Sequence, residues 1–71
     1  MRLMDIIRTI KSRRRDMAIT QRDLAGRSGV SLATVKNIER GTGNPSYSTL
    51  DKLFCVLGLE LDGRLKENPM L

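Results

Sequence analysis

The side chains able to do chemistry in this sequence are mostly cations and neutral hydrogen-bond donors. The 71-residue chain has 13 Lys and Arg against 8 Asp and Glu, which gives a net charge of +5. Such a balance suits a polyanionic partner. With no histidine and Cys55 as the single cysteine, the sequence has almost no ligands for a metal site. We also find no acid–base or nucleophile constellation, and therefore expect neither enzymatic activity nor a cofactor.

The arginine run Arg13–Arg15 belongs to a predicted helix from about Leu3 to Met17. The apolar residues of this segment recur at helical spacing and share one face. They are Leu3, Ile6, Ile7, Ile10 and Met17. Arg14 falls within this apolar stripe, where an unpaired charge would be costly, so it requires a counterion. Arg13 and Arg15 are interpreted as part of a solvated basic face.

Three further helices are predicted downstream. The second covers 21–28, between the N-cap Thr20 and Gly29, whose freedom to adopt positive φ permits a tight turn. The third runs from its cap Ser31 to about residue 40, and the fourth covers about 47–57. Residues 41–46 form a loop by composition. Cys55 lies in the apolar run of the fourth helix and is expected to be a buried, reduced thiol.

The period of the sequence changes after Gly58. Residues 59–66 alternate apolar and polar side chains, which predicts a half-buried strand, although Asp62-Gly63 could instead form a hairpin turn. A lone strand in a helical chain needs a partner for its backbone groups. The simplest partner is the same strand of a second copy. Residues 67–71 are expected to form a tail.

Two short helices joined by a glycine turn make residues 20–40 a helix-turn-helix unit. A residue larger than Ala25 would push the two helices apart, and Gly29 makes the turn. Val35 and Ile38 pack the second helix of the unit against the other helices. Residues 11–57 resemble the lambda-repressor/Cro-like (XRE-type) helix-turn-helix family, through the pattern Thr20-Gln21…Leu24-Ala25…Gly29-Val30-Ser31…Thr34-Val35…Ile38-Glu39-Arg40-Gly41…Asn44-Pro45.

This resemblance implies an all-α fold with a compact four-helix DNA-binding domain over 1–58, and the alternation of residues 59–66 adds the short C-terminal β-strand. It also implies sequence-specific binding to duplex DNA and repression of transcription, with the third helix in the major groove. In this family an arginine of the first helix pairs with the glutamate that ends the recognition helix. The matching residues, Arg14 and Glu39, are therefore predicted to form a structural ion pair.

The resemblance and the groove geometry together identify residues that contact DNA. The predicted base-reading residues, at the start of the third helix, are Ser31, Leu32, Ala33, Lys36 and Asn37. Lys36 could donate to guanine and Asn37 could pair with adenine, whereas the two apolar residues could only contact a group such as a thymine methyl. Gln21 resembles the phosphate-binding glutamine of the family. The predicted phosphate-binding residues are Gln21, Thr34, Arg40, Thr42 and Asn44.

A helix-turn-helix followed by a Leu-Glu-Leu strand further resembles the HipB-type antitoxins. In that group two strands pair across a dimer, which represses its own operon and binds a HipA-type kinase toxin. Leu59, Leu61 and Leu65 would then line the buried face of the dimer strand. A homodimer would bind a palindromic operator with half-sites about one DNA turn (~34 Å) apart. The alternative is a stand-alone regulator of phage or host type without a toxin partner.

Other classes of protein fit the sequence less well. An RNA-associated basic protein would need aromatic base-stacking surfaces, but the chain has one Tyr and one Phe. A membrane-surface peptide would explain an amphipathic basic first helix but not the helix-turn-helix behind it. Because no apolar run approaches the ~18 residues of a membrane span and no signal-peptide pattern opens the chain, the expected location is the cytoplasm, at the nucleoid.

Overall fold

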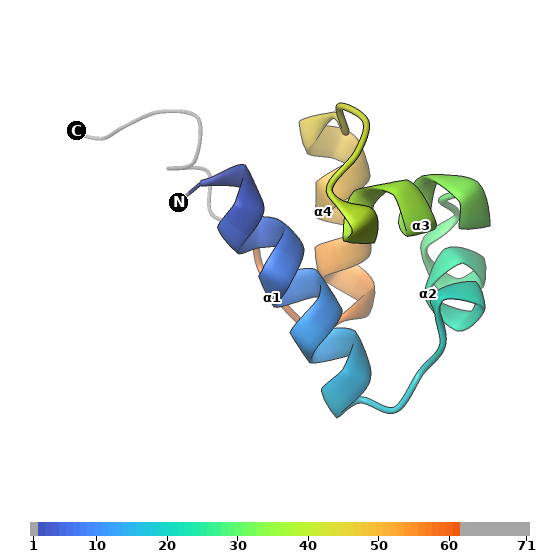
Figure 1. Cartoon of the computed structure of the whole chain (residues 1–71). Helices are drawn as coiled ribbons and strands as arrows, with labels where there is room; N and C mark the ends of the chain where they lie inside the picture. Colours follow the sequence, from blue (N-terminus) through green and yellow to red (C-terminus); the bar gives the residue numbers. More distant parts are fainter. Residues whose placement is uncertain (1, 62–71) are drawn as a thin grey trace.

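Four helices make up the part of the chain that the structure describes, residues 2–61 of a computed structural model (Figure 1). They are α1 (Leu3–Asp16), α2 (Gln21–Ser28), α3 (Leu32–Arg40) and α4 (Tyr47–Val56). α2 packs against α3 and α4, and α1 packs against α3. The predicted all-α bundle is therefore observed over these residues. α1 and α4 each end one residue earlier than predicted, with Met17 and Leu57 as their C-caps.

Local hydrogen bonds fix the helix-turn-helix boundaries. Thr20 Oγ1 accepts the backbone N–H of Asp23 at 2.9 Å, and the Asp23 carboxylate accepts the N–H of Thr20 at 3.0 Å. This capping box satisfies two backbone donors that the first turn of α2 leaves free. Gly29 ends α2 with a φ of 78°, and Ser31 caps α3 through the N–H of Thr34. The three-residue connection between the helices is thus determined locally, as the sequence predicts.

The hydrophobic core lies between the apolar faces of all four helices. Its most deeply buried side chains are Ile10, Leu24, Val35, Ile38, Leu53 and Leu57. Leu3, the first residue of the predicted apolar stripe, remains 43% exposed because it lies at the outer end of α1. The core therefore begins one turn into α1. Only the inner face of α3 packs against the core, and its outer face is left exposed.

The sequence suggested that Arg13 is part of a solvated basic face, but its side chain also makes a contact within the protein. Its Nε donates to the backbone carbonyl of Leu57 at 3.0 Å, across 44 positions of sequence. The last carbonyls of an α-helix lack partners within the helix, so this guanidinium satisfies one of them at the end of α4. The contact joins α1 to α4.

The expectation of a buried Cys55 is wrong, because its thiol is exposed. Cys55 follows the buried Leu50 by five residues, which places it about 140° away around the helix. An apolar run along the sequence is therefore not an apolar face in this helix.

No strand forms within residues 2–61, so the predicted C-terminal strand is not observed over 59–61, the part of it that the structure describes. The N–H of Leu59 donates to the carbonyl of Phe54 at 2.8 Å, and this bond turns the chain back after α4. Leu61 is buried in the core of its own chain, and its carbonyl accepts the Tyr47 hydroxyl at 3.3 Å. A strand needs a ladder partner, and the described helices supply none. Residues 62–66, with Leu65, and the tail 67–71 lie outside the described residues.

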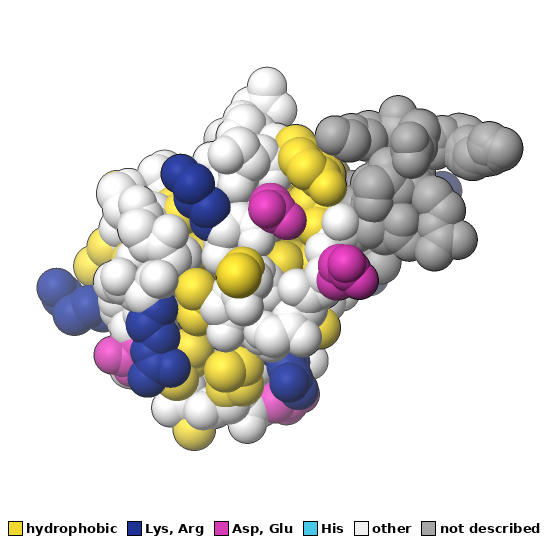
Figure 2. All heavy atoms as spheres, turned by 180° about the vertical axis from the view of Figure 1, so that it is seen from behind, with side chains coloured by type: hydrophobic (Ala, Val, Ile, Leu, Met, Phe, Trp, Pro, Cys, Tyr) yellow, Lys and Arg dark blue, Asp and Glu magenta, His cyan; other side chains and the backbone are white. Residues whose placement is uncertain are grey.

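The surface seen from behind mixes both signs of charge with hydrophobic side chains (Figure 2). The large hydrophobic side chains most exposed in the described part of the chain are Leu3, Met4 and Tyr47. Among the helices of residues 2–61, none combines the length and the apolar character that crossing a bilayer requires.

Candidate nucleic-acid interface

α3 presents a polar outer face while its inner face is packed. Val35 and Ile38 are buried, whereas Ala33, Lys36 and Asn37 on the other side are exposed. Three of the five predicted base-reading residues therefore lie together on a surface that a DNA groove can reach. An α-helix fits the major groove, where each base pair presents a distinct pattern of donors and acceptors.

The two other predicted base-reading residues are partly engaged within the protein. Leu32 is half-buried and packs against the core, so only part of its side chain is available for an apolar contact with a base. The Ser31 hydroxyl accepts the N–H of Thr34 at 3.1 Å and donates to Thr34 Oγ1 at 2.8 Å. Ser31 thus acts as a helix cap. The Thr34 hydroxyl, which is the acceptor here, keeps its own proton to donate.

The structure brings Arg14 and Glu39 together between α1 and α3. Arg14 Nε and Nη2 donate to Glu39 Oε2 at 2.7 Å and Oε1 at 2.9 Å, and Arg14 Nη1 donates to the carbonyl of Ile19 at 2.9 Å. The two side chains are 13% and 4% exposed. The hydrogen bond to Glu39 raises the pKa of Arg14 further above its ordinary value. A two-point contact of this kind is strong and directional, so it fixes how α3 is oriented on α1.

Gln21 joins this ion pair from the start of α2. Its Nε2 donates to Glu39 Oε1 at 3.2 Å, and its side chain is half-buried. Glu39 therefore links α1, α2 and α3 through one carboxylate. No spacing in the sequence indicates the bond between Gln21 and Glu39. It leaves one hydrogen of the Gln21 amide for the phosphate contact that the sequence predicts.

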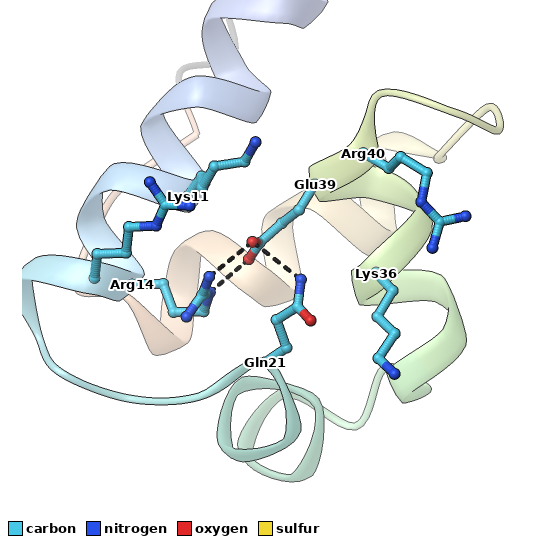
Figure 3. A pocket seen from close by; sticks show the side chains of 7 residues that line it. Lys11, Arg14, Gln21, Lys36, Glu39 and Arg40 are labelled. Carbon is cyan, nitrogen blue, oxygen red and sulfur yellow. Dashed lines mark hydrogen bonds and ion pairs between the residues drawn. The ribbon is translucent and has the colours of Figure 1, made fainter.

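A hollow of about 510 Å³ opens over the ion pair (Figure 3). We call it the basic hollow; its lining residues are Lys11, Arg14, Arg15, Gln21, Lys36, Glu39 and Arg40. In Figure 3, Lys11 lies on α1 at one side of the ion pair, while Lys36 and Arg40 lie on α3 at the other. Glu39 is the one acid of the lining, and Arg14 pairs with its charge. The other cations therefore give this surface a positive charge.

A second hollow lies at the loop between α3 and α4. Three of the predicted phosphate-binding residues, Thr34, Thr42 and Asn44, line it together with Asn37. The N–H and the hydroxyl of Thr42 bond to the Asn37 carbonyl at 2.9 Å and 3.2 Å. We call this surface the loop hollow. Both donors of Thr42 are thus used within the protein, and the side chains left to donate to a phosphate backbone on this side of α3 are Thr34 and Asn44.

Arg40, another predicted phosphate-binding residue, lies apart from the loop hollow. It lines the basic hollow together with Gln21. Its Nη1 lies 3.5 Å from Asn37 Oδ1, so it also approaches a predicted base-reading side chain. The five predicted phosphate-binding residues therefore divide into two groups on opposite flanks of α3.

Sequence reasoning missed Lys11 and Arg15 as members of the site. Their spacing of four residues places them on one face of α1, and that was the only available signal. Which element this face meets depends on how α1 packs against α3, and no local pattern contains that information.

Comparison with known proteins finds a matching family and a related protein. A family model described as helix-turn-helix matches residues 10–63. The immunity repressor protein of Bacillus phage phi105 is 31% identical over 68 residues, which make up 96% of this chain and 47% of that protein. The chain thus spans about half the length of this relative. No solved structure matches the chain.

Proposed function

The chain belongs to the helix-turn-helix family, within its lambda-repressor/Cro-like branch, and from this premise we propose that it binds duplex DNA by sequence and represses transcription. The observation that carries the proposal is the exposed face of α3, with Ala33, Lys36 and Asn37, between two hollows lined by cationic and hydrogen-bonding side chains. This is the arrangement that a groove-binding helix needs, because base contacts lie between two phosphate backbones.

In this proposal the two kinds of contact have separate tasks. Lys36 and Asn37 donate to base edges, and Ala33 contacts an apolar group such as a thymine methyl. Gln21 and Arg40 bind phosphates on one flank. On the other flank Thr34 and Asn44 bind phosphates, and the Thr42 hydroxyl joins them by exchanging the Asn37 carbonyl for a phosphate oxygen. The ion pair between Arg14 and Glu39 contacts no base; it keeps α3, which carries the base-reading residues, in a fixed orientation.

The phage relative supports a stand-alone repressor as the biological role. That protein is named an immunity repressor, and its alignment covers nearly all of this chain. The antitoxin role, which the sequence analysis put first, depends on a C-terminal strand, and the described start of that segment, 59–61, forms none. We therefore propose repression of the phage-immunity kind, without a HipA-type kinase partner.

Selection from a pool of random duplexes tests the DNA-binding function. We expect an enriched sequence that binds at least ~10³-fold more tightly than a mixed-sequence duplex at the same salt concentration. Binding should survive an excess of single-stranded RNA, because α3 fits the groove of a duplex. No enrichment, or complete displacement by the RNA, would contradict the proposal.

The predicted homodimer and palindromic operator stay predictions. A dimer would place two copies of α3 about 34 Å apart, so the selected sequence should be an inverted repeat with that spacing. Light scattering at micromolar concentration, with and without the selected duplex, checks this. A monomeric mass in both conditions, together with a selected site that lacks symmetry, would show one copy per site.

The choice between repressor and antitoxin is tested by what the tagged chain retains in its native cells. For a stand-alone repressor, the chain is expected to co-purify without a stoichiometric protein partner. Retention of a kinase in near-equal amount, resistant to nuclease treatment, would instead establish the antitoxin role.

A further inference from the structure

Two pairs of cations, one from α1 and one from α3, line the basic hollow. Lys11 and Arg15 are one helical turn apart on α1, and Lys36 and Arg40 are one turn apart on α3. Figure 3 shows Lys11 on one side of the ion pair, with Lys36 and Arg40 on the other. Two segments more than twenty residues apart in the sequence thus contribute to one positive surface.

This surface lacks compensating acids. The carboxylate of Glu39 is the one acid in its lining, and it is occupied by Arg14 and Gln21. Lys11, Arg15 and Lys36 form no ion pair within residues 2–61. Like charges spaced four residues apart on a helix repel each other, so both pairs raise the free energy of the unbound fold. A bound anion would relieve this repulsion.

The position of the hollow indicates which anion it binds. Lys36 belongs both to the lining of the hollow and to the exposed face of α3, so an anion in the hollow lies directly beside the groove-facing surface. Gln21, the first residue of α2, lines the same hollow, where the positive end of the helix dipole adds to the field. The phosphates that flank a groove occupy such a position when a helix lies within it.

We propose that Lys11 and Arg15 of α1 bind backbone phosphates of duplex DNA in the basic hollow. The DNA contact surface then includes the first helix as well as the helix-turn-helix. This inference rests on the proposed function, and it adds two residues that the sequence analysis did not assign to DNA binding. Each phosphate neutralised releases counterions and steepens the salt dependence of binding.

The test compares two double variants with the same loss of charge. One is Lys11→Ala with Arg15→Ala. The control is Arg27→Ala with Lys52→Ala, which removes exposed cations of α2 and α4 that lie outside the hollow. The probe is a fluorescent 20-base-pair duplex of mixed sequence, with binding constants measured by anisotropy at several salt concentrations.

The slope of log Kobs against log salt is expected to become shallower by about 0.9 for each phosphate that the variant no longer neutralises, so by about 1 to 2 for the hollow variant. The control variant should change the slope by much less. Arg15→Lys should keep the wild-type slope, because it retains the charge. Without DNA, the hollow variant should unfold at the same or a higher temperature than wild type, since repulsion is relieved.

Two results would overturn the inference, and they differ in what else they affect. Equal slopes for the hollow variant and wild type, or equal changes in the hollow and control variants, would show that Lys11 and Arg15 contact no phosphate while DNA binding itself stands. Failure of the wild-type chain to bind the duplex at low salt would overturn the proposed function and this inference together.

Discussion

Arg14 and Glu39 are 25 positions apart in the sequence, and they meet in a two-point ion pair with N–O distances of 2.7 Å and 2.9 Å. Arg14 also donates to the carbonyl of Ile19, and Glu39 also accepts from Gln21. The pair therefore connects α1, the turn before α2, the start of α2 and the end of α3. This geometry explains how α3, a short helix with an exposed outer face, keeps a fixed orientation relative to α1 and α2.

Loss of the Glu39 charge should destabilise the fold strongly. In Glu39→Gln the Arg14 guanidinium stays charged and nearly buried without its counterion, at a cost of about 3–5 kcal/mol. Urea unfolding followed by circular dichroism measures the change. Asp51→Asn, an exposed substitution on α4 that also removes one acid, is the control and should leave the midpoint nearly unchanged. Equal midpoints for wild type and Glu39→Gln would show that the pair contributes little.

Two glycines of the helix-turn-helix should respond to alanine in opposite directions. A Cβ at Gly26 or Gly29 would meet no atom within 4 Å, so crowding plays no part at either position. Gly26 lies inside α2, where alanine is favoured by about 1 kcal/mol, and Gly26→Ala should stabilise the protein. Gly29 has a φ of 78°, so Gly29→Ala should destabilise it by about 1–2 kcal/mol. Midpoint shifts of the same sign in urea would contradict this assignment.

The capping box of α2 should make stability depend on acid pH. The backbone N–H of Thr20, followed by its hydroxyl, holds the pKa of the Asp23 carboxyl below its usual value. A carboxyl whose pKa is lowered by folding contributes stability above its unfolded pKa of about 3.9, and the contribution disappears as pH falls through the folded pKa. Asp23→Asn should therefore be less stable than wild type at pH 7, and the difference should shrink below about pH 4. A gap of constant size across that range would show that ionisation of Asp23 is not involved.

Lys36 should contribute to base discrimination rather than to general affinity. It lies on the exposed face of α3 and also borders the basic hollow, so both roles are physically open to it. If Lys36 donates to a base edge, Lys36→Ala should lose about 1–3 kcal/mol of discrimination at one base position of the selected duplex. Binding to a panel of duplexes with single base changes measures this. Uniform weakening across the panel, with a shallower salt slope, would make Lys36 a phosphate contact instead.

The local features of this protein follow from its amino-acid sequence alone. Helical spacing, the caps Thr20 and Ser31 and the turn at Gly29 depend on near neighbours, so they are predicted at or within one residue of their observed positions. The apolar stripe of α1 also showed that Arg14 needs a counterion. The family pattern, not the spacing, identified Glu39 as that counterion.

Which helix faces meet is settled by tertiary packing. Packing placed Lys11 and Arg15 beside Lys36, put the Gln21 amide on Glu39, and buried Leu61 in its own chain. It also left Cys55 exposed, against the apolar character of its run. These outcomes depend on how helices far apart in the sequence are rotated and packed against one another. Periodicity fixes which residues share a face, but the free energy of packing the whole core selects the surface that each face contacts.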